Sequence, residues 1–167
     1  VEDMIRKVSK KTDSDLITYD NEEIDLNKPF KRVPFFDLLN ENLGEDISQM
    51  SSQSLKELCN KKGLNTETNN NYGQFLDQLM SEFVEPKLIQ PTFVTDYPTA
   101  ISPLAKKHRN GNEKLVERFE LFIAGSEFAN AFSELNDPID QRERFESQQK
   151  LALDGDEEAH PVDENFL

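Results

Sequence analysis

The sequence has no tryptophan and only one cysteine, Cys59, among its 167 residues. A single cysteine cannot form an internal disulfide, so we expect a reducing compartment, the cytoplasm. Cys59 and the two distant histidines, His108 and His160, do not supply the four ligands of a structural zinc site. No apolar run approaches the ~20 residues of a membrane-spanning helix, so we expect no membrane partner. These absences argue against a disulfide scaffold, a zinc module and a membrane protein.

Basic residues are scarce relative to acidic ones. The chain has 19 Lys and Arg against 33 Asp and Glu, a formal net charge of -14. Nucleic-acid phosphates are bound by clustered Lys and Arg, so this charge argues against a nucleic-acid surface built by this segment itself. The one dense basic run is Lys106–Arg109. It is either a solvated loop or a contact to a phosphate or an RNA end, and the sequence leaves both open.

Hydrophobic periodicity and turn residues predict an α+β chain. Helices are expected at 1–11, 34–44, 54–63, 72–83 and 137–153, and strands at 16–19, 24–26, 30–33, 88–89, 92–95, 116–124 and 127–135. The first three strands should form a small meander. The prolines around residues 92–95 favour an edge position or a strand end. Ser54 and Glu57 fit a capping box at the start of the third helix.

The length suffices for one domain with a hydrophobic core. Residues 45–84 differ in character from the rest, because they hold two predicted helices joined by a polar loop. We expect them to form a helical hairpin inserted between two segments of a larger domain, residues 1–44 and 85–167. The apolar stripe of the second helix should pack internally.

Residues 118–137 read as two strands around a tight turn, yet polar side chains interrupt the apolar pattern. Asn130, Phe132 and Glu134 are spaced by two, so a strand would present all three on one face. An amide, an aromatic ring and a carboxylate on one surface suit a small cationic amphiphile. The carboxylate pairs with an ammonium group and the ring packs against a methylene stem. A solvent-exposed sheet face is the alternative explanation for acidic residues on this hairpin.

Two further acids, Glu120 and Glu127, lie in the same hairpin. With a turn of about three residues centred on Gly125, Glu120 would share the face of Asn130, whereas Glu127 has the opposite parity. Glu127 can reach that face only if the second strand contains a bulge or a strong twist, which we expect at Phe128–Ala129. Two carboxylates near one point indicate a divalent metal, Mg2+ with a phosphate-bearing ligand.

Several stretches of the chain closely resemble class II lysyl-tRNA synthetases: EIDLNKPFKRVPFFDLL, EPKLIQPTFVTDYP followed by SPLAKKHR, ERFELFIAGSEFANAFSELNDPIDQRERFESQ and GDEEAHPVDENFL. The resemblance spans nearly the whole chain and is weakest in residues 45–84, where this family carries a variable helical insertion. Aspartyl and asparaginyl relatives share the fold but not SPLAKKHR or NAFSELNDPIDQ. Ile101 departs from the usual methionine of the family, an exchange of one apolar residue for another.

The resemblance implies the class II catalytic fold, an antiparallel sheet flanked by helices, with a small inserted helical hairpin. It also implies a ligase that activates L-lysine with ATP and passes the lysyl group from lysyl-adenylate to its tRNA. Carried over by motif, Glu120 and Glu127 resemble the ligands of Mg2+ and ATP. Asn130, Phe132 and Glu134 resemble the lysine pocket, with Glu134 facing the substrate ammonium.

Parts of the family pattern do not occur in these 167 residues. They are the dimer-forming first motif, the two motifs that carry ATP-binding arginines, and the anticodon-reading OB-fold. The chain also begins at Val1, directly in a helical pattern. We therefore expect the middle of a catalytic domain, inactive alone, from an enzyme that is a homodimer at full length. A paralogue that lysylates a protein, or a non-enzymatic module derived from a synthetase, remains an alternative.

Overall fold

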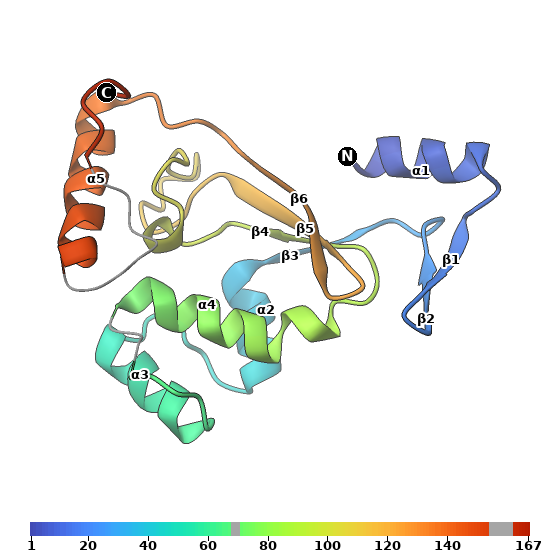
Figure 1. The fold of residues 1–167 in the computed structure, drawn as a ribbon, viewed down its shortest axis with the longest axis horizontal. Helices are drawn as coiled ribbons and strands as arrows, with labels where there is room; N and C mark the ends of the chain where they lie inside the picture. The colour runs from blue at the N-terminus through green and yellow to red at the C-terminus, as the bar shows by residue number, and fades with distance from the viewer. Residues whose placement is uncertain (68–70, 154–161) are drawn as a thin grey trace.

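The computed structural model describes residues 1–67, 71–153 and 162–167, without the side chain of Leu153. His160 lies outside this part of the chain. The helices are α1 (Glu2–Lys11), α2 (Phe35–Leu43), α3 (Ser52–Lys61), α4 (Tyr72–Phe83) and α5 (Pro138–Leu153), with 3-10 turns η1 (Glu85–Lys87) and η2 (Thr99–Ile101). The strands are β1 (Leu16–Tyr19), β2 (Glu22–Asp25), β3 (Lys31–Pro34), β4 (Thr92–Thr95), β5 (Arg118–Ile123) and β6 (Ser126–Phe132). The predicted α+β class is confirmed (Figure 1).

Two sheets organise the strands. β1 and β2 form an antiparallel pair, and the larger sheet has the order β3-β4-β5-β6. β3 runs parallel to β4, whereas the other neighbours are antiparallel. The predicted meander is therefore wrong in its third strand, which leaves the hairpin and pairs far along the chain. In that pairing Val33 lies opposite Val94 and is buried. The alternation of apolar and polar residues within one segment does not reveal a pairing with a strand so far along the chain.

The prolines predicted an edge position or a strand end for β4. The edge position is wrong, because β4 lies between β3 and β5, whereas the strand end is confirmed. Pro91 and Pro98 flank the strand instead of interrupting it, so all of its amides remain available for pairing. Leu88 and Ile89, which were expected to be extended strand, instead accept hydrogen bonds from the hairpin turn. The amides of Gly125 and Ala124 donate to their carbonyl oxygens at 3.1 and 2.9 Å.

The third helix begins earlier than the capping-box pattern predicts. The cap is Ser51, whose hydroxyl oxygen accepts from the amide of Ser54 at 3.2 Å. Ser54 is therefore inside the helix, and the side chain of Glu57 accepts from Gln53 at 2.8 Å instead of reaching back to a cap. Two serines three residues apart both carry the cap signal, and the earlier one adds a turn of helix.

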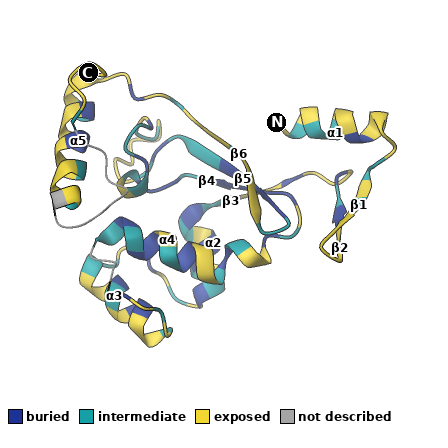
Figure 2. Cartoon of the chain, viewed as in Figure 1, coloured by how far each residue is buried: buried dark blue, intermediate teal, exposed yellow. Residues whose placement is uncertain are grey.

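Two hydrophobic clusters cover opposite faces of the larger sheet. The larger one joins α2, α3 and α4 to the side chains of Val33, Val94 and Phe122. The smaller one packs the segment after β1 against Leu121 and Ile123. The alternation along β5 thus divides its side chains between the two clusters. Figure 2 shows the buried residues concentrated where these helices meet the sheet, while α1 and β6 are largely exposed.

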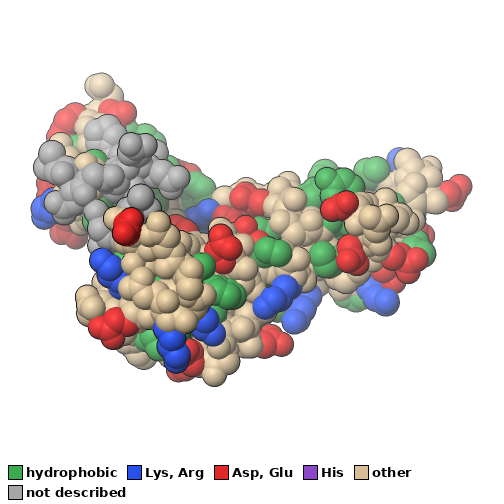
Figure 3. Space-filling view, turned by 60° about the horizontal axis from the view of Figure 1, so that its bottom comes forward, with side chains coloured by type: hydrophobic (Ala, Val, Ile, Leu, Met, Phe, Trp, Pro, Cys, Tyr) green, Lys and Arg blue, Asp and Glu red, His purple; other side chains and the backbone are tan. Residues whose placement is uncertain are grey.

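The predicted stripe of α4 is confirmed as buried: Phe75, Leu76, Leu79 and Met80. It belongs to the same cluster as α2 and β4. The division into residues 1–44, 45–84 and 85–167 stays a prediction. In the described part of the chain, no helix is long and apolar enough to cross a membrane. On the face drawn in Figure 3, basic and acidic side chains are interspersed over the surface.

Candidate functional site

The hairpin of β5 and β6 turns through two residues, Ala124 and Gly125. Both have positive φ angles, 52° and 72°, the pattern of a type I′ turn that matches the twist of the strands. The turn is one residue shorter than expected. Ile123 consequently pairs with Ser126 at the tip.

The predicted bulge is confirmed. Phe122 pairs with Glu127 and Leu121 pairs with Ala129, so Phe128 is an extra residue in β6 without a partner. Beyond the bulge, Glu120 lies directly opposite Asn130. Because Glu120 and Phe122 share one face of β5, the bulge brings Glu127 to the same face as Glu120 and Asn130. The one extra residue in β6 thus allows Glu127 and Asn130 to lie on the same face although they are three positions apart.

Glu120 is held by three donors in a nearly closed environment. The residue as a whole is only 8% exposed. Oε2 accepts from the Tyr97 hydroxyl at 2.6 Å, and Oε1 accepts from Asn130 Nδ2 at 3.2 Å and from the Arg118 guanidinium. Burial raises the pKa of Tyr97, and the negative charge of Glu120 raises it further. Tyr97 therefore stays protonated and acts as a permanent donor to the carboxylate.

Arg118 is the cation of this cluster. Its Nη1 donates to the carbonyl oxygen of Ile101 and to Ser102 Oγ, both at 2.8 Å. Nε donates to Asn130 Oδ1 at 3.3 Å, and the guanidinium carbon lies 4.7 Å from the centre of the Tyr97 ring. These contacts fix the amide of Asn130 between Arg118 and Glu120.

Sequence reasoning missed both Arg118 and Tyr97. Arg118 carried a usable signal, because it lies two residues before Glu120 and must share its face on the strand. Tyr97 carried none, since its approach to Glu120 depends on the pairing of β4 with β5 across a long connection.

Glu127 adds an exposed carboxylate near the buried one. A third acid, Glu85 at the start of η1, lies in the same field: burial raises its pKa, and the charges of Glu120 and Glu127 raise it further. The described residues contain no group of three His, Cys, Asp or Glu close enough to hold a metal ion. Mg2+, however, is usually held by one or two carboxylates together with phosphate oxygens. Only Glu120 and Glu127 are brought to one face by the strand pairing, a number of carboxylates within that range.

The remaining predicted residues continue along β6. Phe132 lies opposite Arg118 and is 39% exposed. Glu134 lies beyond the end of the strand, where the backbone forms a bridge with Ala105. Its carboxylate is exposed and has no hydrogen-bond or ion-pair partner within the described residues. The structure thus joins Glu120, Glu127 and Asn130 on one face, with Phe132 and Glu134 following toward the 105 region.

Each side chain of the basic run at Lys106–Arg109 has a partner elsewhere in the chain. Lys106 donates to Asn136 at 3.1 Å, Lys107 lies 3.3 Å from Asp140, and His108 lies 3.2 Å from Asp96. Arg109 binds Glu117 and lowers its pKa to about 2, chiefly through the side-chain hydrogen bond. These pairs order the loop and favour its reading as a folded, solvated connection.

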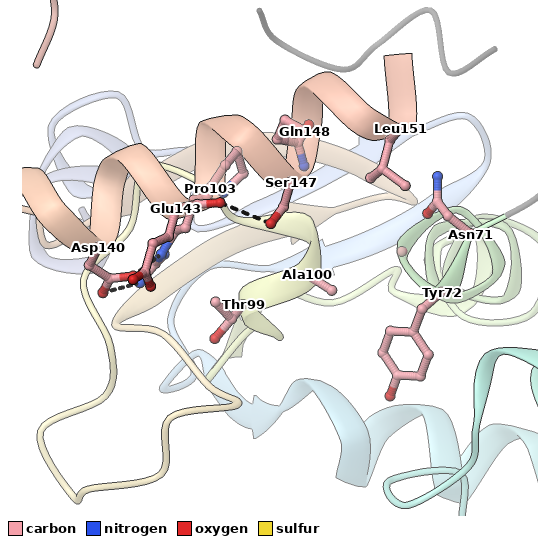
Figure 4. A pocket seen from close by; sticks show the side chains of 12 residues that line it. Asn71, Tyr72, Thr99, Ala100, Pro103, Asp140, Glu143, Ser147, Gln148 and Leu151 are labelled. Carbon is pink, nitrogen blue, oxygen red and sulfur yellow. Dashed lines mark hydrogen bonds and ion pairs between the residues drawn. The ribbon is translucent and has the colours of Figure 1, made fainter. Parts of the chain in front are cut away.

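A cavity of about 400 Å³ lies between α5, the start of α4 and residues 99–103 (Figure 4). Asp140 and Arg144, which form an ion pair, line one side of it, and Tyr72 and Leu151 line others. None of the predicted site residues lines this cavity. Pro103, which also lines the cavity, follows Ile101 and Ser102, the two residues that accept hydrogen bonds from Arg118.

Comparison with known proteins places these observations in context. Residues 1–167 match the family model described as tRNA synthetases class II (D, K and N). A lysine–tRNA ligase of Saccharolobus solfataricus is 49% identical over 169 residues, covering 99% of this chain and 34% of the relative. A ligase of the same name from Porphyromonas gingivalis is 49% identical over 144 residues, covering 86% of this chain and 25% of the relative. One from Prochlorococcus marinus is 48% identical over 157 residues, covering 91% and 30%. The chain thus spans between a quarter and about a third of the length of these relatives.

Proposed function

The chain belongs to the class II tRNA synthetases of the D, K and N group, and from that premise we propose that it forms the middle of the catalytic domain of a lysine–tRNA ligase. The observation that supports this most is the bulge at Phe128, which gathers Glu120, Glu127 and Asn130 on one sheet face. A hairpin that served only to pack the core would not need an extra residue that brings the carboxylate of Glu127 to the same face as that of Glu120. Identity near 49% to proteins named lysine–tRNA ligase supports the choice of amino acid.

The proposed reaction begins with attack of the lysine carboxylate on the α-phosphorus of ATP. Pyrophosphate leaves and lysyl-adenylate forms, and the lysyl group then passes to the terminal ribose of the tRNA. No protein nucleophile is required, so the protein acts by positioning and by stabilising charge. Glu120 and Glu127 would hold Mg2+ together with phosphate oxygens of ATP. When bound, this ion neutralises phosphate charge as the pyrophosphate departs.

Within the chain, Glu120 is prepared for this role before any ligand binds. Tyr97, Arg118 and Asn130 fix both oxygens of the carboxylate, so its orientation requires no reorganisation during the reaction. Glu127 is exposed and has freedom to adjust to the incoming phosphate. Glu120 would therefore be a ligand of fixed orientation, and Glu127 a ligand that adapts to the bound phosphate.

The lysine pocket would follow along the same strand. Phe132 offers an apolar surface for the methylene stem, and the unpaired carboxylate of Glu134 would bind the terminal ammonium. A neutral side chain would leave that charge unpaired, which favours lysine over uncharged amino acids. Asn130 connects the two regions, since its amide contacts Glu120 and Arg118.

Other features of the whole enzyme are part of this proposal. Its partners would be L-lysine, ATP and the tRNA for lysine, the enzyme would be a homodimer, and it would act in the cytoplasm. The net charge of -14 supports tRNA binding by other parts of the enzyme.

A chimaeric ligase tests the proposal. In it, these 167 residues replace the matching stretch of the Saccharolobus solfataricus lysine–tRNA ligase, which is 49% identical. We expect lysine to support ATP–pyrophosphate exchange within about tenfold of the parent rate, with aspartate and asparagine at the blank. A chimaera that is monodisperse and melts cooperatively, but shows no lysine-dependent exchange, would contradict the proposal. Charging of tRNA by the same preparation separates a tRNA ligase from an enzyme that lysylates proteins.

A further inference from the structure

Two side chains of α5 hold a loop that contacts the candidate site from behind. The 101–105 loop comprises residues 101–105, from the last residue of η2 up to the basic run. Arg144 Nη1 donates to the carbonyl oxygens of Ser102 and Ala105 at 3.2 and 2.7 Å. Gln141 Nε2 donates to the carbonyl oxygen of Pro103 at 3.1 Å. Gln141 and Arg144 are three positions apart in the sequence and lie on the same side of the helix.

The opposite side of the 101–105 loop contacts the site. The carbonyl of Ile101 and the hydroxyl of Ser102 accept both donated bonds of Arg118 Nη1, and Arg118 in turn binds Glu120. At the other end, Ala105 pairs with Glu134 through the backbone. The amide of Leu135 also donates to Leu104 O at 2.9 Å. The loop therefore supports the proposed metal–ATP residue and the proposed ammonium ligand together.

Burying the polar side chains of Arg144 and Gln141 costs free energy that packing of the helix alone does not require. Arg144 is a guanidinium only 9% exposed, and it is neutralised by Asp140 at 3.0 and 3.1 Å. Gln141 is 3% exposed, and its Oε1 has no hydrogen-bond partner among the described residues. Apolar side chains of similar volume would anchor the helix without desolvated polar atoms, as Phe145 already does beside them. What apolar side chains could not supply is the set of donors to three loop carbonyls.

We propose that Arg144, assisted by Gln141, is a positioning residue of the active site: it fixes the 101–105 loop and, through it, the orientations of Arg118, Glu120 and Glu134. In this role Arg144 would act through the loop and not by contact with a substrate. The inference rests on the proposed function, because it assigns Glu120 and Glu134 to ATP and lysine. Displacements of about 1 Å transmitted from a distance are enough to weaken a reaction that depends on positioning.

The test uses the chimaeric ligase and its Arg144→Met, Arg144→Lys and Gln141→Leu variants. Arg142→Ala is the matched control, because Arg142 lies on the same helix and pairs with Glu164 at the surface. KM values for lysine and ATP are measured in pyrophosphate exchange and kcat is expressed per active site, titrated by the adenylate burst. Melting temperatures are recorded in parallel.

Arg144→Met should raise the KM for lysine about tenfold and the KM for ATP severalfold, at an unchanged fraction of active sites. Arg144→Lys should recover part of this loss, because one ammonium can reach one carbonyl but cannot bridge two and Asp140. Gln141→Leu should raise the KM for lysine about threefold, and Arg142→Ala should leave both constants within about twofold.

A role in packing alone predicts a different outcome, namely a lower melting temperature and fewer active sites with unchanged KM values. That result, or a KM for lysine within about twofold of the parent in Arg144→Met, would overturn the inference. If Arg144→Met does not fold, Arg144→Lys and Gln141→Leu decide by the same criterion. An inactive unmutated chimaera would instead count against the proposed function, so the two failures are distinguishable.

Discussion

The Arg118–Glu120 pair yields a quantitative prediction about the base of the site. The perturbation is a double-mutant cycle of Arg118→Met and Glu120→Gln in the 167-residue chain. The two side chains are 17% and 11% exposed, so each charge is largely removed from water. Removing one partner of such a pair leaves the other charge poorly compensated.

The magnitude follows from the contacts that remain. Arg118→Met leaves Glu120 with two donors, Tyr97 and Asn130, so the loss should be smaller than the ~3–5 kcal/mol of a fully broken buried pair. The two bonds to Ile101 and Ser102 are lost as well, which brings the total to about 3 kcal/mol. Glu120→Gln should cost about 2 kcal/mol, because Arg118 keeps its other acceptors. The double variant should lose about 3.5 kcal/mol, a coupling of about 1.5 kcal/mol.

Urea unfolding followed by circular dichroism measures the free energies of unfolding. The exposed pair Arg142–Glu164, with side chains 44% and 67% exposed, is the control cycle and should couple by less than about 0.5 kcal/mol. A coupling at Arg118–Glu120 no larger than that of the control would refute the reasoning, because the pair would then not be formed as a desolvated unit.

Three further predictions concern the same region. Deleting Phe128 from the chimaeric ligase removes only the unpaired residue of β6, so lysine-dependent exchange should persist within about tenfold. Deleting Ala131 turns Phe132 to the other face of the strand and should abolish the exchange. Equal losses of exchange in the two deletion variants would contradict this prediction. Glu117 has its pKa lowered from 4.5 to about 2 by Arg109, so it stabilises the fold above pH 4.5 and this contribution disappears as the pH falls toward 2. The urea midpoint of the parent should therefore exceed that of Glu117→Gln at neutral pH and converge with it near pH 2, and a constant difference would count against the pair. The isolated 167-residue chain should show no lysine-dependent pyrophosphate exchange, since family motifs with ATP-binding arginines do not occur in it; exchange clearly above the blank would show that reasoning to be wrong.

Local patterns predicted a large share of the fold. The helix at residues 72–83 and the bulge at Phe128 were both predicted, because periodicity and parity are properties of short segments. If Glu127 serves the same site as Asn130, as the family resemblance implies, parity requires an extra residue between them, and the strand contains it. The position of the site acids on one face was therefore accessible without any coordinates.

The failures share a different physical origin. The parallel pairing of β3 with β4, the central place of β4 and the bond from Tyr97 to Glu120 all depend on segments that are distant in sequence. Neither composition nor spacing specifies such partners. The prediction of the helix cap was wrong for a local reason. Ser51 and Ser54 are both favourable cap residues, and the sequence does not show at which of them the helix begins.

We propose that one strand face carries two neighbouring regions, an ATP region at Glu120 and Glu127 and a lysine region ending at Glu134. The most direct measurement is the pair of KM values, for lysine and for ATP, in Glu134→Gln and Glu127→Gln forms of the chimaeric ligase, with the exposed Glu113→Gln as control. We predict that Glu134→Gln raises the KM for lysine about 100-fold and leaves the KM for ATP within about threefold, while Glu127→Gln does the reverse with a rise of about tenfold. Variants that change both constants equally, or change neither, would contradict the account.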